Sequence, residues 1–261
     1  MEEHSTSSRV GGASVPASLV DKPSPAARLA GTLAPPHWLL HNSGPCDPAF
    51  NMALDEALME LVPQLGAPVL RFYGWTQPAA SFGYFQHHAE IERATTLRPL
   101  VRRPTGGGLV PHDADWTYSL AFPPTHEWYE LSAVESYQRV HEWIRDAFKR
   151  VGVESELAPC CRKSAPGQCF VGHEKSDVLW EGRKIAGAAQ RRTKTGLLIQ
   201  GSVQPPPIKV AKADWQAAMC VTAIGQWCAS WDELIIEGAL LARAEELEEI
   251  KYAQAAYNEK R

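Results

Sequence analysis

Helical and strand patterns do not alternate regularly along this chain, and their order restricts its fold more than any other feature. Amphipathic helices are expected after Asp47 and after Ser132. Segments with strand character occupy 69–73, 80–82, 116–122, 177–180, 183–187 and 197–203. Large and small residues alternate over 116–122, which predicts a half-buried strand. Regular alternation of strands and helices would indicate a doubly wound parallel sheet. This order favours the α+β class, with a mixed, largely antiparallel sheet flanked by helices.

Short signals mark the ends of several elements. Asp47-Pro48 is a favourable helix start, and Ser132-x-x-Glu135 is a capping-box pattern. Glu181-Gly182 predicts the tight turn of a β-hairpin. The stretch from Lys212 has helical character, and a second capping-box pattern, Ser230-x-x-Glu233, predicts a further helix start there.

Composition changes near residue 36. Residues 1–36 are rich in Ser, Ala, Pro and Gly, so we expect a disordered tail there and a single folded domain over 37–261, although the length also allows two small domains. The net charge of -4 gives no overall attraction to nucleic acid. We find neither a membrane-spanning apolar run nor a secretory signal, and six cysteines in 261 residues favour free thiols in a reducing cytoplasm.

The first segment with chemical character combines arginines with glycines that leave the main chain accessible. Its candidate ligand-binding residues are Arg102, Arg103, Gly106, Gly107, Gly108 and His112. Consecutive glycines allow a ligand to approach the backbone N–H groups, and the arginines would hold a phosphate or carboxylate. The alternative is a flexible turn before a strand. The segment is not a P-loop, because no Gly-Lys-Ser/Thr follows.

The second segment is the strand that carries Lys184. Lys184 and Ile185 are neighbours on a strand, so their side chains are expected on opposite faces, with Lys184 in solvent or in a cleft. Gly187, Ala188 and Ala189 follow, and these small residues leave room beside the lysine for a ligand backbone or an acyl chain.

Cys169 is the third candidate. An isolated cysteine is more often a small buried apolar residue than a nucleophile. A position near Lys184 would lower its thiol pKa and make it reactive. Cys160, Cys161, Cys169 and His173 lack the usual spacing of zinc ligands, so no metal site is expected.

Together these segments resemble the lipoate–protein ligase and octanoyltransferase superfamily, which shares its catalytic fold with biotin–protein ligases. The likeness covers about residues 37–258. It lies in Arg71-Phe72-Tyr73-Gly74-Trp75 with 81–86, in 102–113, in Asp177 with Gly182-Arg183-Lys184-Ile185-Ala186-Gly187-Ala188-Ala189-Gln190, and in Gln200-Gly201-Ser202. The chain departs from the family pattern at Ala188, where Ser is frequent, and at Ile199, where His is common.

The resemblance is closest to the cysteine-dependent octanoyltransferases, because Cys169-Phe170 precedes the lysine hairpin. It implies that Cys169 takes octanoate from acyl carrier protein as a thioester, with Lys184 stabilising charge. The acyl group, octanoyl or lipoyl, would then pass to a lysine of a lipoyl domain or of the glycine-cleavage H protein. The triple-glycine segment would hold acyl or carrier groups, and no cofactor would be needed.

Two alternatives remain open. An ATP-dependent lipoate–protein ligase would use ATP and Mg²⁺, with Gly106 to Gly108 holding phosphate and Lys184 contacting the acyl-adenylate. The second alternative is a non-catalytic protein that binds acyl groups or lipoyl domains. The departures from the family pattern at Ala188 and Ile199 motivate it.

Three cations follow the lysine hairpin, namely Arg191, Arg192 and Lys194. Acyl carrier proteins and lipoyl domains are generally acidic, so these cations are candidates for docking them. A solvated cationic turn is almost as good an explanation.

Overall fold

The structure is a computed structural model and describes residues 36–162, 172–207, 209–227 and 230–260. The tail expected over 1–36 therefore lies outside the described residues, except for Pro36. The domain boundary near residue 37 stays a prediction. None of the helices in these ranges is long and apolar enough to cross a lipid bilayer.

An eight-stranded sheet forms the centre of the fold, with strand order β11-β1-β2-β6-β10-β9-β8-β7. In that order the strands are Ser230–Glu233, His37–Cys46, Val69–Trp75, Trp116–Phe122, Leu197–Val203, Arg183–Arg192, Val178–Trp180 and Glu156–Leu157. The pairs β11·β1 and β1·β2 are parallel, and the remaining neighbours are antiparallel. The prediction of a mixed, largely antiparallel sheet is confirmed.

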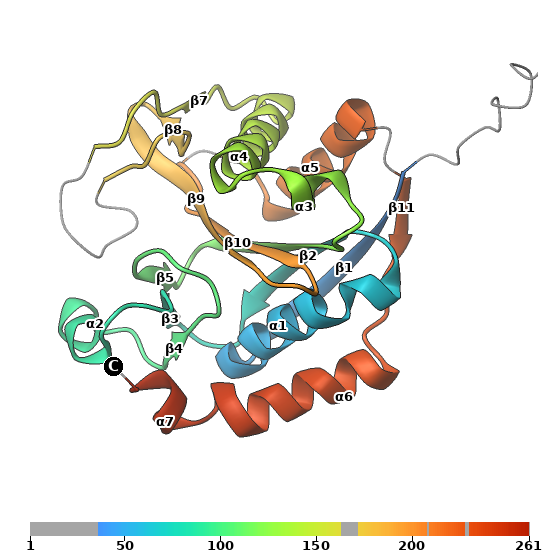
Figure 1. The fold of residues 1–261 in the computed structure, drawn as a ribbon. Coiled ribbons are helices and arrows are strands. Elements are labelled where there is room, and N and C mark those ends of the chain that lie inside the picture. The colour runs from blue at the N-terminus through green and yellow to red at the C-terminus, as the bar shows by residue number, and fades with distance from the viewer. Residues whose placement is uncertain (1–35, 163–171, 208, 228–229, 261) are drawn as a thin grey trace, which may run out of the picture. The chain divides into compact units, whose positions relative to one another are not determined.

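Helices cover both faces of this sheet (Figure 1). On one face lie α3 (Glu127–Glu130), α4 (Ala133–Arg150) and α5 (Lys212–Trp227); on the other lie α1 (Pro48–Leu65) and α6 (Gly238–Leu247). A π-helical turn, Glu248–Tyr252, leads from α6 to α7 (Ala255–Asn258). The predicted α+β class with flanking helices is therefore confirmed.

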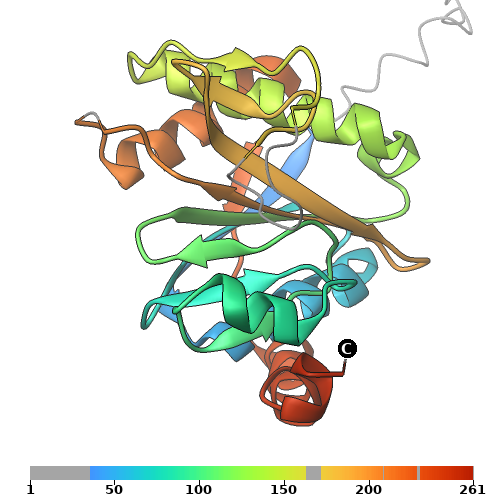
Figure 2. The same cartoon turned by 90° about the vertical axis from the view of Figure 1, so that its left-hand side faces the viewer.

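A second, three-stranded sheet lies beside the first (Figure 2). Its order is β4-β3-β5, made of Leu100–Arg102, Ala79–Phe82 and Val110–His112, with α2 (His88–Ala94) next to it. The backbone N–H of Arg102 donates to Asn258 Oδ1, which attaches α7 to β4. This small sheet carries the segment with the three glycines.

The predicted end signals act as expected at three places. Asp47 caps α1 by accepting from Ala49 N at 2.9 Å, and Ser132 and Glu135 form both bonds of the capping box of α4. Glu181 and Gly182 have φ angles of 48° and 73° between β8 and β9. Two consecutive positive φ angles are the signature of the type I′ hairpin turn.

Two sequence expectations were wrong. Residues Ser230–Glu233 do not start a helix; they form β11, parallel to the start of β1, because pairing with that exposed sheet edge satisfies their backbone groups. The strand Trp116–Phe122 is buried on both faces instead of half-buried. Helices cover both sides of the central sheet (Figure 1), and of the small alternate residues Ser119 donates to Asp55 of α1, Ala121 packs in the apolar cluster with α1, and Thr117 lines a cavity.

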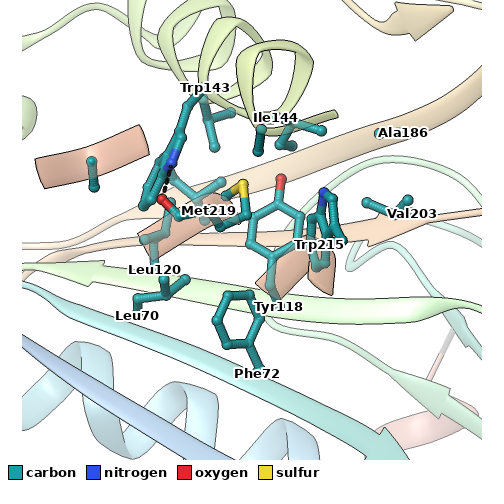
Figure 3. Packing of buried hydrophobic residues seen from close by; sticks show 14 of the residues in the cluster. Leu70, Phe72, Tyr118, Leu120, Trp143, Ile144, Ala186, Val203, Trp215 and Met219 are labelled. Carbon is teal, nitrogen blue, oxygen red and sulfur yellow. Dashed lines mark hydrogen bonds between the residues drawn. The ribbon is translucent and has the colours of Figure 1, made fainter. Parts of the chain in front are cut away.

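The larger apolar core lies between the sheet and α4 and α5 (Figure 3). Side chains of β2 and β6 meet those of the two helices there: Leu70, Phe72, Tyr118, Leu120, Trp143, Ile144, Trp215 and Met219. Trp143 Nε1 donates to the carbonyl of Met219 at 2.8 Å, so the indole joins α4 to α5 without losing its hydrogen bond. Each of these large side chains stabilises the fold by about 1.5–3 kcal/mol.

His141 lies within this core, and its titration should set part of the pH dependence of stability. Its Nδ1 donates to the carbonyl of Tyr137 at 2.7 Å, and its side chain is fully buried. Burial lowers its pKa from 6.5 to about 4, against an opposing effect of Asp177. Between these values the unfolded chain binds the proton more readily, so stability is present above pH 6.5 and is lost as the pH falls towards 4.

We expect this one imidazole to lower the free energy of unfolding by about 3 kcal/mol across that pH window. Urea unfolding of wild type and His141→Gln at neutral and acidic pH measures the effect. In His141→Gln, most of the decrease in the free energy of unfolding between neutral and acidic pH should disappear. In His87→Gln, a substitution at an exposed position, that decrease should remain. An unchanged pH dependence in His141→Gln would contradict the prediction.

Candidate active site

A cavity opens where the two sheets and α1 meet, and it encloses about 460 Å³ of space that is partly open to solvent. Its described lining comes from α1, β2, β3, β5, β6, β9, β10 and the residue after β4: Met52, Tyr73, Trp75, Ser81, Arg103, Val110, His112, Thr117, Lys184, Gly187, Ala188, Ala189, Gln200, Gly201 and Ser202. Six of the predicted site residues meet here although they lie far apart in sequence.

Lys184 lies in this cleft and not in solvent. Its Nζ is 2.8 Å from Asp177 Oδ2, and the two side chains are 7% and 0% exposed. Asp177 also accepts from Glu174 N at 2.7 Å and from the hydroxyl of Tyr137. Burial, and then the Asp177 carboxylate, raise the pKa of Tyr137, so its hydroxyl keeps the proton that it donates. The ammonium is therefore held by a carboxylate that is itself fixed by two further donors.

Glycine at position 187 leaves space for the end of the Lys184 side chain. A Cβ there would lie 2.6 Å from Cε and 2.7 Å from Nζ of Lys184. At Gly201, on the adjacent strand, a Cβ would lie 2.1 Å from the ring of Tyr118. The small residues predicted to leave room at 187–189 do line the cavity, and Gly187 gives its space to the lysine side chain.

The triple-glycine segment is held by Arg103. Its guanidinium donates to the carbonyl of Gly106 at 2.7 Å and to that of Gly108 at 2.6 Å. Gly107 has a φ of +84°, and its carbonyl lies where a Cβ of Gly83 would be, at 2.0 Å. A ligand was expected to approach the backbone of this loop closely; in the structure the backbone at Gly83 makes that close approach. The glycines themselves are not part of the described cavity lining.

Arg102 does not reach the cavity, contrary to the expectation that both arginines hold the ligand. It is fully buried, and its guanidinium donates to the carbonyls of Tyr84, Gln86 and Asn258 at 2.9, 2.7 and 2.9 Å. These bonds tie β4 to the 84–86 loop and to α7. Successive residues leave opposite sides of a strand, so Arg103 faces the cavity and Arg102 the C-terminal helix.

His112 lines the cavity in a chain of hydrogen bonds. Its Nε2 is 2.8 Å from Ser81 Oγ, and its Nδ1 is 2.9 Å from Asp115 Oδ2. The imidazole stacks on Trp75 with ring centroids 3.9 Å apart, and it is 4% exposed. His112 was a candidate from the sequence, but Asp115 and the contact with Ser81 were not. The three-residue spacing of His112 and Asp115 could have indicated Asp115. The contact between His112 and Ser81 joins two strands, so no local spacing indicates it.

A buried polar network forms the floor of the cavity. Gln200 donates from Nε2 to Asp55 Oδ2 at 2.7 Å and accepts at Oε1 from Thr105 Oγ1 at 2.8 Å. From the sequence, Gln200 was expected on a strand that resembles one of the family, and no function was assigned to it. Ile199 beside it packs in the apolar core, on the other side of β10, so this departure from the family pattern does not touch the cavity.

Cys169 lies outside the described residues. On either side of the undescribed stretch, Arg162 and His173 exchange backbone hydrogen bonds of 2.8 and 3.0 Å. Cys169 precedes Asp177 by eight positions in the sequence, and a chain segment of that length spans at most about 29 Å. Within the described ranges, no group of three or more His, Cys, Asp or Glu side chains is arranged to hold a metal ion.

The three candidate docking cations differ in their surroundings. Arg192 donates to the carbonyls of Tyr129 and Leu131, so it holds a loop. Arg191 is 36% exposed, with Nη1 3.6 Å from Glu56 Oε1. Lys194 is exposed. Arg192 is itself exposed while it makes these bonds, so all three cations remain docking candidates.

Comparison with known proteins gives a match to one family model and matches to several solved structures. A family model described as the lipoyl protein ligase A/B catalytic domain matches residues 47–204. A putative lipoate protein ligase from T. acidophilum has a TM-score of 0.72 at 20% identity, covering 87% of this chain and 100% of that one. A lipoate-protein ligase A bound with ATP has a TM-score of 0.70 at 19% identity, covering 87% and 99%.

Curated relatives are more similar in sequence. Octanoyltransferase LipM of Geobacillus kaustophilus is 37% identical over 179 residues, and that of Bacillus subtilis is 36% identical over 183. Each match covers 64% of this chain and 64% of the relative, so the chain spans less than two thirds of their length. The family model, in contrast, matches more than half of the 261 residues, and this chain therefore belongs to the lipoyl protein ligase A/B catalytic domain family.

Proposed function

We propose that this protein transfers an octanoyl group from a carrier thioester to a lysine of a second carrier domain, through a thioester on Cys169. The observation that carries the proposal is the buried Lys184–Asp177 pair in a cavity lined by Gly187 to Ala189. Relatives named octanoyltransferases, 34–37% identical over 179–186 residues, support the choice of acyl group.

In the proposed first step the Cys169 thiolate attacks the carbonyl carbon of the octanoyl thioester. The carbon–sulfur bond to the carrier breaks, and the carrier sulfur leaves as a thiolate that takes a proton from water. The Lys184 ammonium stabilises first the thiolate and then the negative charge that develops on the carbonyl oxygen. Because Asp177 fixes the ammonium, this stabilisation needs no rearrangement of the site.

In the second step the amine of the acceptor lysine attacks the Cys169 thioester. The carbon–nitrogen bond of an amide forms as the carbon–sulfur bond to Cys169 breaks, the nitrogen gives up a proton to water, and the Cys169 thiolate is restored. We propose acyl carrier protein as donor, and a lipoyl domain or the glycine-cleavage H protein as acceptor. A related fold of 19% identity and TM-score 0.63 belongs to an archaeal ligase described with its E2 lipoyl domain, which motivates an acceptor of that class.

The intermediate is tested by incubating the protein with octanoyl carrier protein and measuring its intact mass. We expect a mass increase of one octanoyl group that maps to Cys169 and is absent from Cys169→Ala. Cys160→Ala, which removes an exposed thiol, should keep the adduct. No Cys169 adduct, together with lipoate-dependent exchange of pyrophosphate into ATP, would replace this proposal by the ATP- and Mg²⁺-dependent ligase. Binding without either reaction would favour the non-catalytic alternative.

The positioning of Lys184 is tested by Asp177→Asn. Loss of the carboxylate leaves the ammonium buried without its partner, so we expect kcat to fall by about 10²–10³-fold. KM for the octanoyl carrier should change little, because neither of the charges that Lys184 stabilises lies on the octanoyl carrier in its ground state. Gly187→Ala, which displaces Nζ, should act in the same direction. Asp214→Asn, on the exposed first turn of α5, is the control, and equal activity of Asp177→Asn and that control would rule out the role.

Docking of an acidic acceptor is tested by the double charge reversal Arg191→Glu and Lys194→Glu. Exposed ion pairs contribute about 0.2–1 kcal/mol each, so KM for the acceptor should rise by about threefold to tenfold at low salt, with kcat unchanged. Lys149→Glu with Arg150→Glu, at the exposed end of α4, is the matched control. An unchanged KM in the first double variant would identify the turn as merely solvated.

A further inference from the structure

A second nucleophile of conventional geometry lies in the described part of the cavity. Ser81 on β3 contacts the imidazole of His112 on β5 at 2.8 Å, and that imidazole contacts Asp115 at 2.9 Å. A hydroxyl, a base within hydrogen-bond reach and a third group that orients the base are the elements of serine acyl-transfer chemistry. We propose that Ser81 is a second acyl-accepting group, which gives the protein a hydrolase activity towards medium-chain acyl esters and thioesters.

The hydrogen bonds fix the direction of proton transfer. Asp115 Oδ2 also accepts from Thr117 Oγ1 at 3.0 Å and from Ser202 Oγ at 2.7 Å, so it acts as an acceptor towards all three neighbours. His112 Nδ1 must then carry the hydrogen, and Nε2 presents its lone pair to the hydroxyl of Ser81. This is the tautomer that a general base needs.

Two neighbours hold this arrangement in place. Trp75 stacks on the imidazole with the ring planes 19° apart, and its own Nε1 donates to Thr117 Oγ1 at 2.8 Å. Arg103 Nη1 donates to Ser81 Oγ at 3.2 Å, so the oxygen cannot rotate away from the imidazole without losing a charged donor. Ser81 and His112 are 3% and 4% exposed, which removes most of the competing water.

The cavity brings an acyl group within reach of Ser81. Ser81 and His112 line the same space as Lys184 and the small residues of β9. The small sheet that carries β3 and β5 lies beside β9 and β10 in both ribbon views (Figures 1 and 2). An acyl chain beside Gly187 to Ala189 therefore lies in the same cavity as Ser81, and the Lys184 ammonium is a cation for the oxyanion of the reaction at Ser81.

The reaction balances without a cofactor. Ser81 Oγ bonds to the carbonyl carbon while its proton moves to His112 Nε2. The carbon–sulfur or carbon–oxygen bond to the leaving group then breaks, and the leaving group takes that proton. Water attacks the resulting ester, His112 accepts the proton of the water and returns it to Ser81, and a fatty acid is released. No step uses Cys169.

The experiment uses the full-length Cys169→Ala protein, an alkyl fluorophosphonate that labels activated serines, and p-nitrophenyl octanoate. We expect stoichiometric labelling that maps to Ser81, together with slow ester hydrolysis. His112→Gln in this background should slow both by about 10²–10⁴-fold, the usual contribution of a general base. Ser230→Ala, on β11 at the far edge of the central sheet, is the matched control and should keep both.

Ser81→Ala in the Cys169→Ala background should abolish labelling and hydrolysis while the protein retains a cooperative thermal transition. If it does not fold, Ser81→Cys keeps the geometry and should become the fastest-alkylated thiol, at a rate that His112→Gln reduces. Folded Cys169→Ala protein that carries no label on Ser81 would overturn the inference and assign the hydrogen-bond chain to holding β3 against β5. Wild-type protein that labels on Ser81 but forms no octanoyl-Cys169 would overturn the proposed transferase alone.

Discussion

The buried ion pair between Asp55 of α1 and Arg71 of β2 is the interaction on which the site depends. Nη1 of Arg71 lies 2.7 Å from Oδ1 of Asp55, and both side chains are fully buried. The carboxylate also accepts from Tyr73, Ser119 and Gln200, so one group joins α1 to β2, β6 and β10. Removing either charge would leave the other buried and unpaired, at a cost of about 3–5 kcal/mol.

This pair also determines where the triple-glycine segment lies. Gln200 donates to Asp55 with its amide nitrogen, which leaves its amide oxygen to accept from Thr105, just before the glycines. Arg103 then holds the carbonyls of Gly106 and Gly108. Floor and loop are therefore one hydrogen-bonded system, and a ligand would meet a preformed cavity.

Local signals predicted the elements, and long-range contacts decided the rest. Asp47, Ser132 and Glu181-Gly182 act within a few residues of themselves, so their roles could be predicted from sequence. The pattern at Ser230 failed because an open strand edge elsewhere in the chain competed for the same backbone groups. Arg102 and Arg103 are identical in type, and what distinguishes them is that one side of the chain there faces α7 and the 84–86 loop and the other faces the cavity. The position of Lys184 on a strand that continues with small residues could be predicted, because spacing along one strand is a local property.

The two carboxylates next to the cavity show how burial determines chemistry. Asp177 contacts an ammonium, and the pair places the end of the Lys184 side chain in the cavity. Asp115 contacts an imidazole, and its acceptor oxygen selects the tautomer with a free lone pair at Nε2. One carboxylate thus contacts the ammonium of Lys184 on β9, and the other orients the imidazole of His112 on β5. Because a carboxylate left unpaired inside the protein is costly, the contacts that stabilise Asp177 and Asp115 also position Lys184 and His112 at the cavity.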